Sequence, residues 1–222
     1  MERPHSHHAQ LACRICLVRH GETDWNVARR LQGHLDIPLN ENGMAQAAST
    51  ARHLESLHFD AAYSSDLQRA WLTATAIAAQ RPHAVQSEPR LRERHYGIFQ
   101  GLTYDDAMAR HPEAYARFKA RDLAQPIPGD GESLVDFADR VTAALTQIAQ
   151  RHPGEQVLVV THGGVLDIAH RLAAAKALEA PRDFTIPNAA LNWIALEGGR
   201  WRLIAWGDES HLLAALDEPP NT

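Results

Sequence analysis

The sequence has only two cysteines, Cys13 and Cys16, in 222 residues. They are too few and too close together for a disulfide framework, and without a second Cys-x-x-Cys pair they supply at most half of a zinc site. Both lie in the apolar run from Leu11 to Val18, where the alternation of a strand turns them to opposite faces of a sheet or buries them. We therefore predict buried structural thiols, with a redox pair as the alternative.

The chain also lacks any long run of one kind of residue. Its formal net charge is −5 and its isoelectric point is about 6.3, and no block of lysine and arginine is present to follow a phosphate backbone, so nucleic acid is not an expected partner. No stretch is long enough to cross a bilayer, and the N-terminal MERPHSHHAQ lacks the apolar segment of a secretory signal. We expect a cytoplasmic protein without a membrane partner, with flexible tails over residues 1–12 and 218–222.

Strand and helix patterns alternate through the first half of the chain. A short apolar run ends at Arg19, and Asn40 then occupies the cap position of a helix whose apolar residues follow i, i+3, i+4, i+7 spacing. A brief strand through Tyr63 precedes a cap predicted at Ser64-Ser65-Asp66 and a second helix. This pattern places Arg69 in the first turn of that helix.

The second half continues the alternation. Thr103 with Asp106, and Ser133 with Asp136, resemble capping pairs that begin helices. QVLVVTHGG is almost continuous in apolar residues, as expected for a central strand covered on both faces, and its two glycines open the next helix. LNWIALE and WRLIAWG flank a Gly-Gly turn and predict an antiparallel hairpin, which is a candidate homodimer surface through its tryptophans, Trp193 and Trp206.

These elements predict one α/β domain over residues 13–217, a three-layer sandwich around a mostly parallel central sheet. The 45% hydrophobic content is sufficient for one core of this size. In such a sheet ligands bind outside the carboxyl ends of the strands, so His20 and His162, each followed by glycine at a predicted strand end, should face one crevice. Arg69 comes from the same edge. A single histidine at the end of a strand is usually structural. Two such histidines together with Arg19 and Arg69 favour a functional site.

Four motifs carry a resemblance to a known family. LVRHGETDWN, SSDLQRA, LRERHYGIFQG and VVTHGG occur in the order and approximate spacing of the histidine phosphatase superfamily, the phosphoglycerate-mutase-like proteins. The resemblance extends from Ile15 to GDESHL near the C-terminus. It implies an α/β sandwich with an insert over the site, here a short helical cap at about residues 103–128.

The resemblance also implies roles for individual residues. His20 is implied as the nucleophile that becomes phosphohistidine, and Glu93 as the general acid and base. Arg19, Arg69 and His162 are implied to hold the phosphoryl group, with help from Asn26. An ion pair with Arg92 or Arg94 is the alternative reading of Glu93.

Phosphoryl chemistry accounts for these residue types. A phosphate monoester carries nearly two negative charges, and guanidinium groups such as those of Arg19 and Arg69 are permanently charged forks that match its oxygens. The same cations should lower the pKa of His20 and keep its attacking nitrogen unprotonated. Glu93 would protonate the leaving oxygen and then deprotonate water in a ping-pong reaction, so no metal or other cofactor is expected.

The other candidates on the substrate or phosphate side are Gly21, Thr23, Gln32, Gly33, Tyr104 and Gly163. We expect Gly21 to let phosphate approach the backbone. Thr23, with Glu22, is expected to position the loop, and a surface role is its alternative. Gln32 and Gly33 are expected to line the pocket, with a plain turn as the alternative.

The family divides between mutases and phosphatases. Cofactor-dependent phosphoglycerate mutases carry a lysine where this chain has Tyr104, and they have a longer insert with paired arginines, whereas residues 103–128 space Arg117, Lys119 and Arg121 singly. Fewer cations leave less to retain a bisphosphorylated intermediate, so hydrolysis is favoured. We expect a histidine-acid-phosphatase type of phosphoric monoester hydrolase acting on a small phosphorylated metabolite. A phosphoglycerate mutase and a catalytically silent phospho-ligand binding protein are the alternatives.

Overall fold

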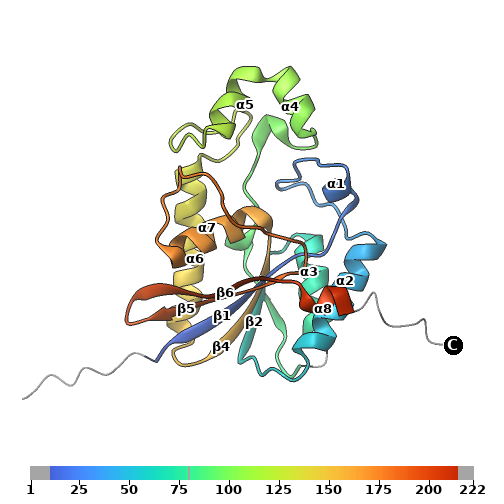
Figure 1. The fold of residues 1–222 in the computed structure, drawn as a ribbon, viewed down its shortest axis with the longest axis vertical. Helices are drawn as coiled ribbons and strands as arrows, with labels where there is room; N and C mark the ends of the chain where they lie inside the picture. The colour runs from blue at the N-terminus through green and yellow to red at the C-terminus, as the bar shows by residue number, and fades with distance from the viewer. Residues whose placement is uncertain (1–10, 80, 215–222) are drawn as a thin grey trace, which may run out of the picture.

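A six-stranded sheet runs through the middle of the molecule (Figure 1). The computed structural model describes residues 11–79 and 81–214. The strands are β1 (Cys13–Arg19), β2 (Ala61–Ser64), β3 (Val85–Ser87), β4 (Gln156–Thr161), β5 (Leu191–Glu197) and β6 (Arg200–Asp208), in the spatial order β3-β2-β4-β1-β5-β6. All pairs among β1 to β4 are parallel, and β5 is antiparallel to both of its neighbours. The predicted α/β class with a mostly parallel sheet is confirmed.

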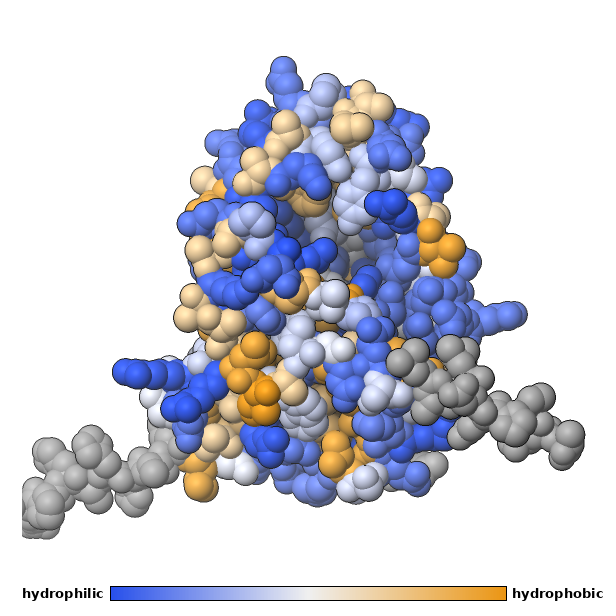
Figure 2. Space-filling view, in the orientation of Figure 1, coloured by the Kyte–Doolittle hydropathy of each residue, from blue (hydrophilic) through white to orange (hydrophobic). Residues whose placement is uncertain are grey.

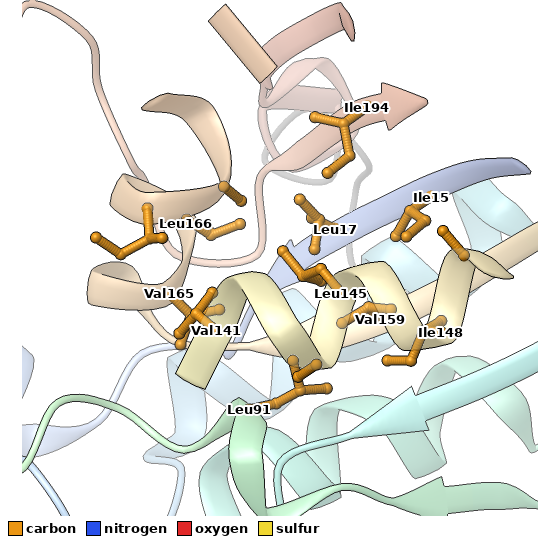
Figure 3. Close-up of a cluster of buried hydrophobic side chains, with 14 of the residues drawn as sticks. Ile15, Leu17, Leu91, Val141, Leu145, Ile148, Val159, Val165, Leu166 and Ile194 are labelled. Carbon is orange, nitrogen blue, oxygen red and sulfur yellow. The ribbon is translucent and has the colours of Figure 1, made fainter. Parts of the chain in front are cut away.

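One face of the sheet is covered by α6 (Leu134–Arg151) and α7 (Gly163–Ala174). Val141, Leu145 and Ile148 recur at helical spacing on α6 and belong to the core on this face of the sheet. In Figure 3, Leu145 lies next to Leu17 of β1, and Val141 lies next to Val165 of α7. As predicted, Ser133 caps α6, since its side chain accepts the N–H of Asp136.

The other face is covered by α2 (Glu41–Leu54) and α3 (Gln68–Ala78). Asn40 caps α2 by accepting the N–H of Gly43 at 2.8 Å, as predicted. The predicted Ser64-Ser65-Asp66 cap of α3 is wrong. The helix begins after Leu67, and the N–H of Gln68 donates instead to Asp36 Oδ1 at 2.7 Å, so a distant loop caps α3.

Cys13 and Cys16 behave as the alternation predicts. Cys13 packs in the α6–α7 core and Cys16 in the α2–α3 core, on opposite faces of the sheet. Both thiols are unpaired and buried, and burial raises the pKa of Cys13 to about 11 and that of Cys16 further. These are properties of structural thiols rather than of a redox pair.

A smaller third core lies beyond the sheet, at the top of Figure 1. Its helices are α4 (Tyr104–Arg110) and α5 (Pro112–Lys119), and Thr103 caps α4 as predicted. Phe99 is fully buried there, with Tyr115 and Phe118 packed around it. The remaining short elements are α1 (Asp24–Val27), η1 (Pro89–Leu91), η2 (Gly97–Phe99) and α8 (Ser210–Ala214).

The C-terminal hairpin forms as predicted. Gly198 and Gly199 both have positive φ in the turn between β5 and β6. Strand β6 is at the edge of the sheet, where Leu203 and Ile204 are exposed, and the homodimer through this hairpin stays a prediction. Most of the predicted N-terminal tail and all of the C-terminal tail lie outside the described residues. No helix of the described ranges has the length and apolar composition that a bilayer crossing requires.

Candidate active site

Two histidines follow neighbouring parallel strands and come together. His20 follows β1 and His162 follows β4, and the N–H of His20 donates to the Thr161 carbonyl at 2.9 Å. The centroids of the two rings are 5.2 Å apart at an interplanar angle of 59°. The two histidines therefore lie together at the carboxyl end of the sheet, as expected.

The hydrogen bonds of His20 determine which ring nitrogen is free. Its Nδ1 lies 2.7 Å from the Gly21 carbonyl oxygen, and because a carbonyl can only accept, Nδ1 carries the hydrogen. Nε2 then holds the lone pair when the ring is neutral. Burial lowers the pKa of His20 well below its usual value, and the charges of Arg69 and Arg19 add to this effect. The arginines were the predicted cause, but burial is the larger one, and the ring is neutral at pH 7.

Arg19 and Arg69 bring buried guanidinium groups to the same place. Arg69 donates from Nη1 to the Leu35 carbonyl and from Nη2 to the Gly33 carbonyl, both at 2.8 Å, while Arg19 donates from Nη1 to the Ile186 carbonyl. Within the described residues the Nε atoms of both arginines are buried without a hydrogen-bond partner. Burial lowers the pKa of Arg69 to about 10, which still leaves it charged at neutral pH.

His162 is held by a residue that sequence reasoning had placed elsewhere. Its Nε2 lies 2.8 Å from the Ser65 hydroxyl, the residue wrongly expected to cap α3. The ring is fully buried, and burial, followed by the charge of Arg69, lowers the pKa of His162 well below its usual value. Its Nδ1 is also buried with no partner in the described chain. A buried polar atom without a partner is costly, so a ligand that accepts a hydrogen bond from any of these nitrogens would be stabilised.

The carboxylate of Glu93 lies at the N-terminus of α7. Oε2 accepts the N–H of Gly164 at 2.9 Å, and Oε1 accepts the backbone N–H of Arg94 at 2.8 Å. A Cβ at Gly164 would lie 2.0 Å from Oε1, so only glycine permits this approach. The alternative ion pair of Glu93 is wrong for both candidates. Arg92 binds Asp66 through Nε at 2.7 Å, and the Arg94 guanidinium donates to the Glu132 carbonyl.

A second layer of contacts fixes the segment that carries Glu93. Its carbonyl oxygen lies 2.8 Å from His34 Nε2 and accepts from Arg140 Nη2 at 3.2 Å. Arg140 also donates to the carbonyls of Arg90 and Arg92 and forms a two-point ion pair with Glu132. Sequence reasoning missed Arg140, because on α6 it is one of several polar positions.

The loop after His20 is organised by a capping box. Thr23 accepts the N–H of Asn26, and Asn26 Oδ1 accepts from the N–H of Thr23 at 3.1 Å and from Asn188 Nδ2 at 3.3 Å. Asn26 lines the pocket beside His20, whereas Thr23 is fully buried behind it. Glu22 accepts from Asn40 Nδ2, which ties the loop to α2 as the positioning role predicts. Asn188 also donates to the His20 carbonyl and was missed, since it lies 168 residues away in sequence.

The glycines of the predicted site have varied environments. A Cβ at Gly21 would lie 2.4 Å from the Gly43 carbonyl oxygen, so packing on α2 by itself requires glycine here, and the approach of a phosphate stays a prediction. Gly33 has φ of 55°, and its carbonyl anchors Arg69, which agrees with the alternative of a turn. Gly163 lines a pocket beside Arg19, and Gln32 lines the pocket of His20.

Two pockets meet at this site. A small one of about 80 Å³ contains His20, Asn26, Gln32 and Arg69, and a larger one of about 570 Å³ extends toward α5 and the start of α7. Both are lined by Arg19, Glu93, Tyr96 and Tyr104. Tyr96 was not singled out from the sequence although it is part of the RERHYG motif. No group of three or more His, Cys, Asp or Glu in residues 11–79 and 81–214 is arranged to hold a metal.

The chain is similar in sequence and in structure to known proteins. The chain is 44% identical over 201 residues to phosphoglycerate mutase-like protein 4 of Arabidopsis thaliana, covering 89% of this chain and 86% of that protein. It is 43% identical over 201 residues to the metal-independent phosphoserine phosphatase of the same plant, covering 89% and 82%. The solved structure of Bacillus stearothermophilus YhfR superposes with a TM-score of 0.84 at 35% identity, covering 90% of this chain and 99% of that one.

The profile of the histidine phosphatase superfamily (branch 1) matches residues 15–209, which include both histidines, both arginines and Glu93. This span is most of the described chain, and the matched relatives are covered over more than four-fifths of their own length. The chain therefore belongs to branch 1 of the histidine phosphatase superfamily.

Proposed function

We propose that this protein is a phosphoric monoester hydrolase of the histidine acid phosphatase type, which hydrolyses a small phosphorylated metabolite through a phosphohistidine on His20 without a metal. One observation carries the proposal. His20, whose Nε2 holds the lone pair, lines a small pocket together with Arg19 and Arg69. In the described residues Arg19 Nε, Arg69 Nε and Nδ1 of the adjacent His162 ring are buried without hydrogen-bond partners. The relative named as a metal-independent phosphoserine phosphatase supports the hydrolytic branch.

In the first half-reaction His20 Nε2 attacks phosphorus and the ester bond breaks. The charge on the phosphoryl oxygens is shared by Arg19, Arg69 and His162, which are already fixed by their own hydrogen bonds and need not reorganise. With the Ser65 hydroxyl donating to Nε2 of His162, Nδ1 of that ring is the donor to the phosphoryl group. Glu93, on the pocket wall, gives its proton to the leaving oxygen.

In the second half-reaction a water attacks the phosphohistidine. Glu93 now accepts the proton of that water, so the same carboxylate serves both steps, and phosphate leaves with His20 restored. Asn26, Gln32, Gly163 and Tyr104 line the pockets and are proposed to contact the substrate or phosphate.

The remaining proposals concern the rest of the chain. Residues 103–128 act as the cap of a single domain over residues 13–217, and the protein acts in the cytoplasm. Hydrolysis is favoured over phosphoglycerate mutation because Tyr104, rather than a lysine, lines both pockets.

The experiment is hydrolysis of 4-nitrophenyl phosphate in EDTA, combined with acid quenching of a ³²P-labelled substrate. We expect turnover that vanadate blocks and a transient label on the protein, with both lost in His20→Ala. Arg69→Gln should lower the rate about 100-fold or more, as for other preorganised oxyanion donors. His83→Ala, an exposed histidine, is the matched control and should keep both signals.

Hydrolysis that persists in His20→Ala would contradict the mechanism. Interconversion of phosphoglycerates that 2,3-bisphosphoglycerate stimulates, at a rate above hydrolysis, would favour the mutase. Binding of phosphate esters without any turnover would favour the silent binding protein.

A further inference from the structure

One short loop contacts two separate groups of the active site. The carbonyls of Gly33 and Leu35 accept from the Arg69 guanidinium, both at 2.8 Å. Between these two residues, His34 places its Nε2 atom 2.8 Å from the carbonyl oxygen of Glu93. The loop therefore joins Arg69, which is proposed to hold the phosphoryl oxygens, to Glu93, which is proposed to protonate the leaving oxygen.

The hydrogen bond of His34 determines which of its ring nitrogens is the donor. A carbonyl can only accept, so Nε2 carries the hydrogen. This hydrogen is present in the protonated ring as well as in the neutral one, so the contact does not depend on the protonation of Nδ1. The ring of His34 also lies edge-on to that of His95, with the centroids 4.9 Å apart and an interplanar angle of 82°. The side chain thus lies against two residues of the segment that carries Glu93.

The backbone of this loop is attached to its surroundings on both sides of His34. Asp36 Oδ1 accepts the N–H of Gln68 at 2.7 Å, so the loop binds the start of α3 as well as the side chain of Arg69. The N–H of His34 donates to Gln100 Oε1 at 2.7 Å. The ring of His34 therefore extends toward Glu93 from a backbone that is already fixed.

The Glu93 carbonyl accepts from a second side chain of the described chain, Arg140. Its Nη2 donates at 3.2 Å, which is longer than the 2.8 Å of the contact with His34. Arg140 belongs to α6 and fixes Glu93 relative to that helix. His34 is the donor that comes from the loop holding Arg69, so the two donors differ in what they connect to Glu93.

The surroundings of Glu93 are polar. It lines the small pocket together with His20 and Arg69, and it also lines the larger one. Figure 2 shows the molecule hollowed between the α4–α5 region and the sheet, with mainly hydrophilic residues around the hollow. Such surroundings offer hydrogen bonds more than apolar packing, so the hydrogen bonds of its backbone bear directly on where the Glu93 carboxylate lies.

We propose that His34 is a positioning residue that fixes Glu93 relative to Arg69, a role that rests on the proposed function. The leaving oxygen is bonded to phosphorus, so its place is set by the groups that hold the phosphoryl oxygens. Glu93 can protonate this oxygen only at hydrogen-bond distance. A misplacement of about 1 Å can cost about 100-fold in rate, so a direct link between the two groups protects the rate.

The test compares two substitutions of His34. His34→Leu removes the donor and keeps an apolar side chain in its place, whereas His34→Gln keeps an N–H near the position of Nε2. For an alkyl phosphate, whose leaving oxygen needs a proton, we expect kcat/KM to fall about tenfold in His34→Leu and only about twofold in His34→Gln. For 4-nitrophenyl phosphate, whose leaving group needs little protonation, both variants should stay within about twofold of the wild type.

A double-mutant cycle identifies the group through which His34 acts. Glu93→Gln removes the acid but keeps the backbone carbonyl that His34 binds. In that background, His34→Leu should lower the rate for the alkyl phosphate by less than about twofold, because no acid is left to misplace. The inhibition constant of inorganic phosphate, which reports binding by Arg19, Arg69 and His162, should be nearly unchanged in His34→Leu. A general disruption of the site would weaken phosphate binding as well.

His83→Leu is the matched control, since it makes the same change at an exposed histidine in the turn before β3. It should leave both rates unchanged. Equal losses on the alkyl and aryl substrates, a full further loss in the Glu93→Gln background, or a loss in His34→Gln as large as that in His34→Leu would overturn the positioning role. A wild-type protein that hydrolyses neither substrate would instead refute the proposed function, and the role of His34 with it.

Discussion

Gly164 is the residue that lets the carboxylate of Glu93 reach the first turn of α7. The Oε2 atom of Glu93 accepts the N–H of Gly164, and helix N-termini favour negative charge because their first N–H groups are unpaired. The neighbouring Gly163 has a different environment, since a Cβ there would be in ordinary contact, 3.5 Å from Arg19 Nε. Glycine is therefore required at position 164 for steric reasons, whereas position 163 has room for a Cβ.

We predict that Gly164→Ala uncouples proton donation from phosphoryl transfer. The added Cβ would lie 2.0 Å from Glu93 Oε1 and 3.2 Å from Phe137 Cζ, so the carboxylate must move. General acid catalysis contributes about 100-fold or more, so kcat/KM for an alkyl phosphate should fall by about this factor. For 4-nitrophenyl phosphate, whose leaving group needs little protonation, the loss should be much smaller.

Gly163→Ala is the comparison for this experiment, and it should change the alkyl-to-aryl rate ratio far less. Thermal unfolding of both variants checks that the fold is retained. An alkyl-to-aryl ratio in Gly164→Ala equal to that of the wild type would show that the carboxylate keeps its position or has no role as an acid.

At the scale of elements, local patterns explain why most helices and strands could be predicted. Asn40, Thr103 and Ser133 cap their helices through a partner three residues along the chain, so the signal is complete within a short segment. The cap of α3 could not be predicted because Asp36 supplies it from a loop that is 32 residues away. Ser65 was then left to bind His162.

In the site, too, contacts within one segment could be predicted and contacts between distant segments could not. The motifs around Arg19, His20 and His162 are each contiguous, and the parallel pairing of β1 with β4 brings them together. The residues that hold these groups in place are far away in sequence. Asn188 is 168 residues from His20, and Arg140 is 47 residues from Glu93, so no pattern within one segment contains either contact.

We predict that Arg140 on α6 is a positioning residue for Glu93. Arg140→Gln breaks the ion pair with Glu132 and removes the donor to the carbonyls of Arg90 and Arg92. The segment that carries Glu93 should loosen, and kcat/KM should fall about tenfold or more for an alkyl phosphate but less for an aryl one. The free energy of unfolding should fall by about 1–3 kcal/mol, since Glu132 is left without its charged partner.

A merely structural role of Arg140 would lower both rates by the same factor, so the rate ratio decides the matter. Arg151→Gln, at the exposed end of the same helix, is the control and should change neither the ratio nor the stability appreciably. Equal losses on the two substrates would contradict the positioning role.

At the scale of the whole molecule, the buried histidines affect both the catalytic reaction and the stability of the fold. His20 and His162 are 3% and 0% exposed, and burial is the main cause that lowers the pKa of each ring well below its usual value. A neutral imidazole is required for attack on phosphorus, and the same burial makes its protonation costly to the fold. The site therefore links the protein's tolerance of acid to its chemistry.

We predict that the free energy of unfolding decreases as the pH is lowered from 7 toward 5.5. In the unfolded chain a histidine titrates near 6.5, whereas in the folded chain His20 and His162 titrate lower, so below pH 6.5 the unfolded state binds more protons. Their contribution to stability is complete above 6.5 and is lost as the pH falls, by up to about 1.4 kcal/mol per pH unit for each ring. Urea unfolding at several pH values measures this slope. His162→Gln should reduce it in part, since His34, His170 and His211 also have lowered pKa values and contribute to the same slope. The ion pair of Asp66 with Arg92 and that of Glu88 with Arg90 lower the pKa of each acid, so these two carboxylates stay charged over the range of the experiment. A free energy of unfolding that stays constant between pH 7 and 5.5 would mean that both rings take up protons in the folded protein as easily as in water, and the neutral nucleophile inferred for His20 would fail with it.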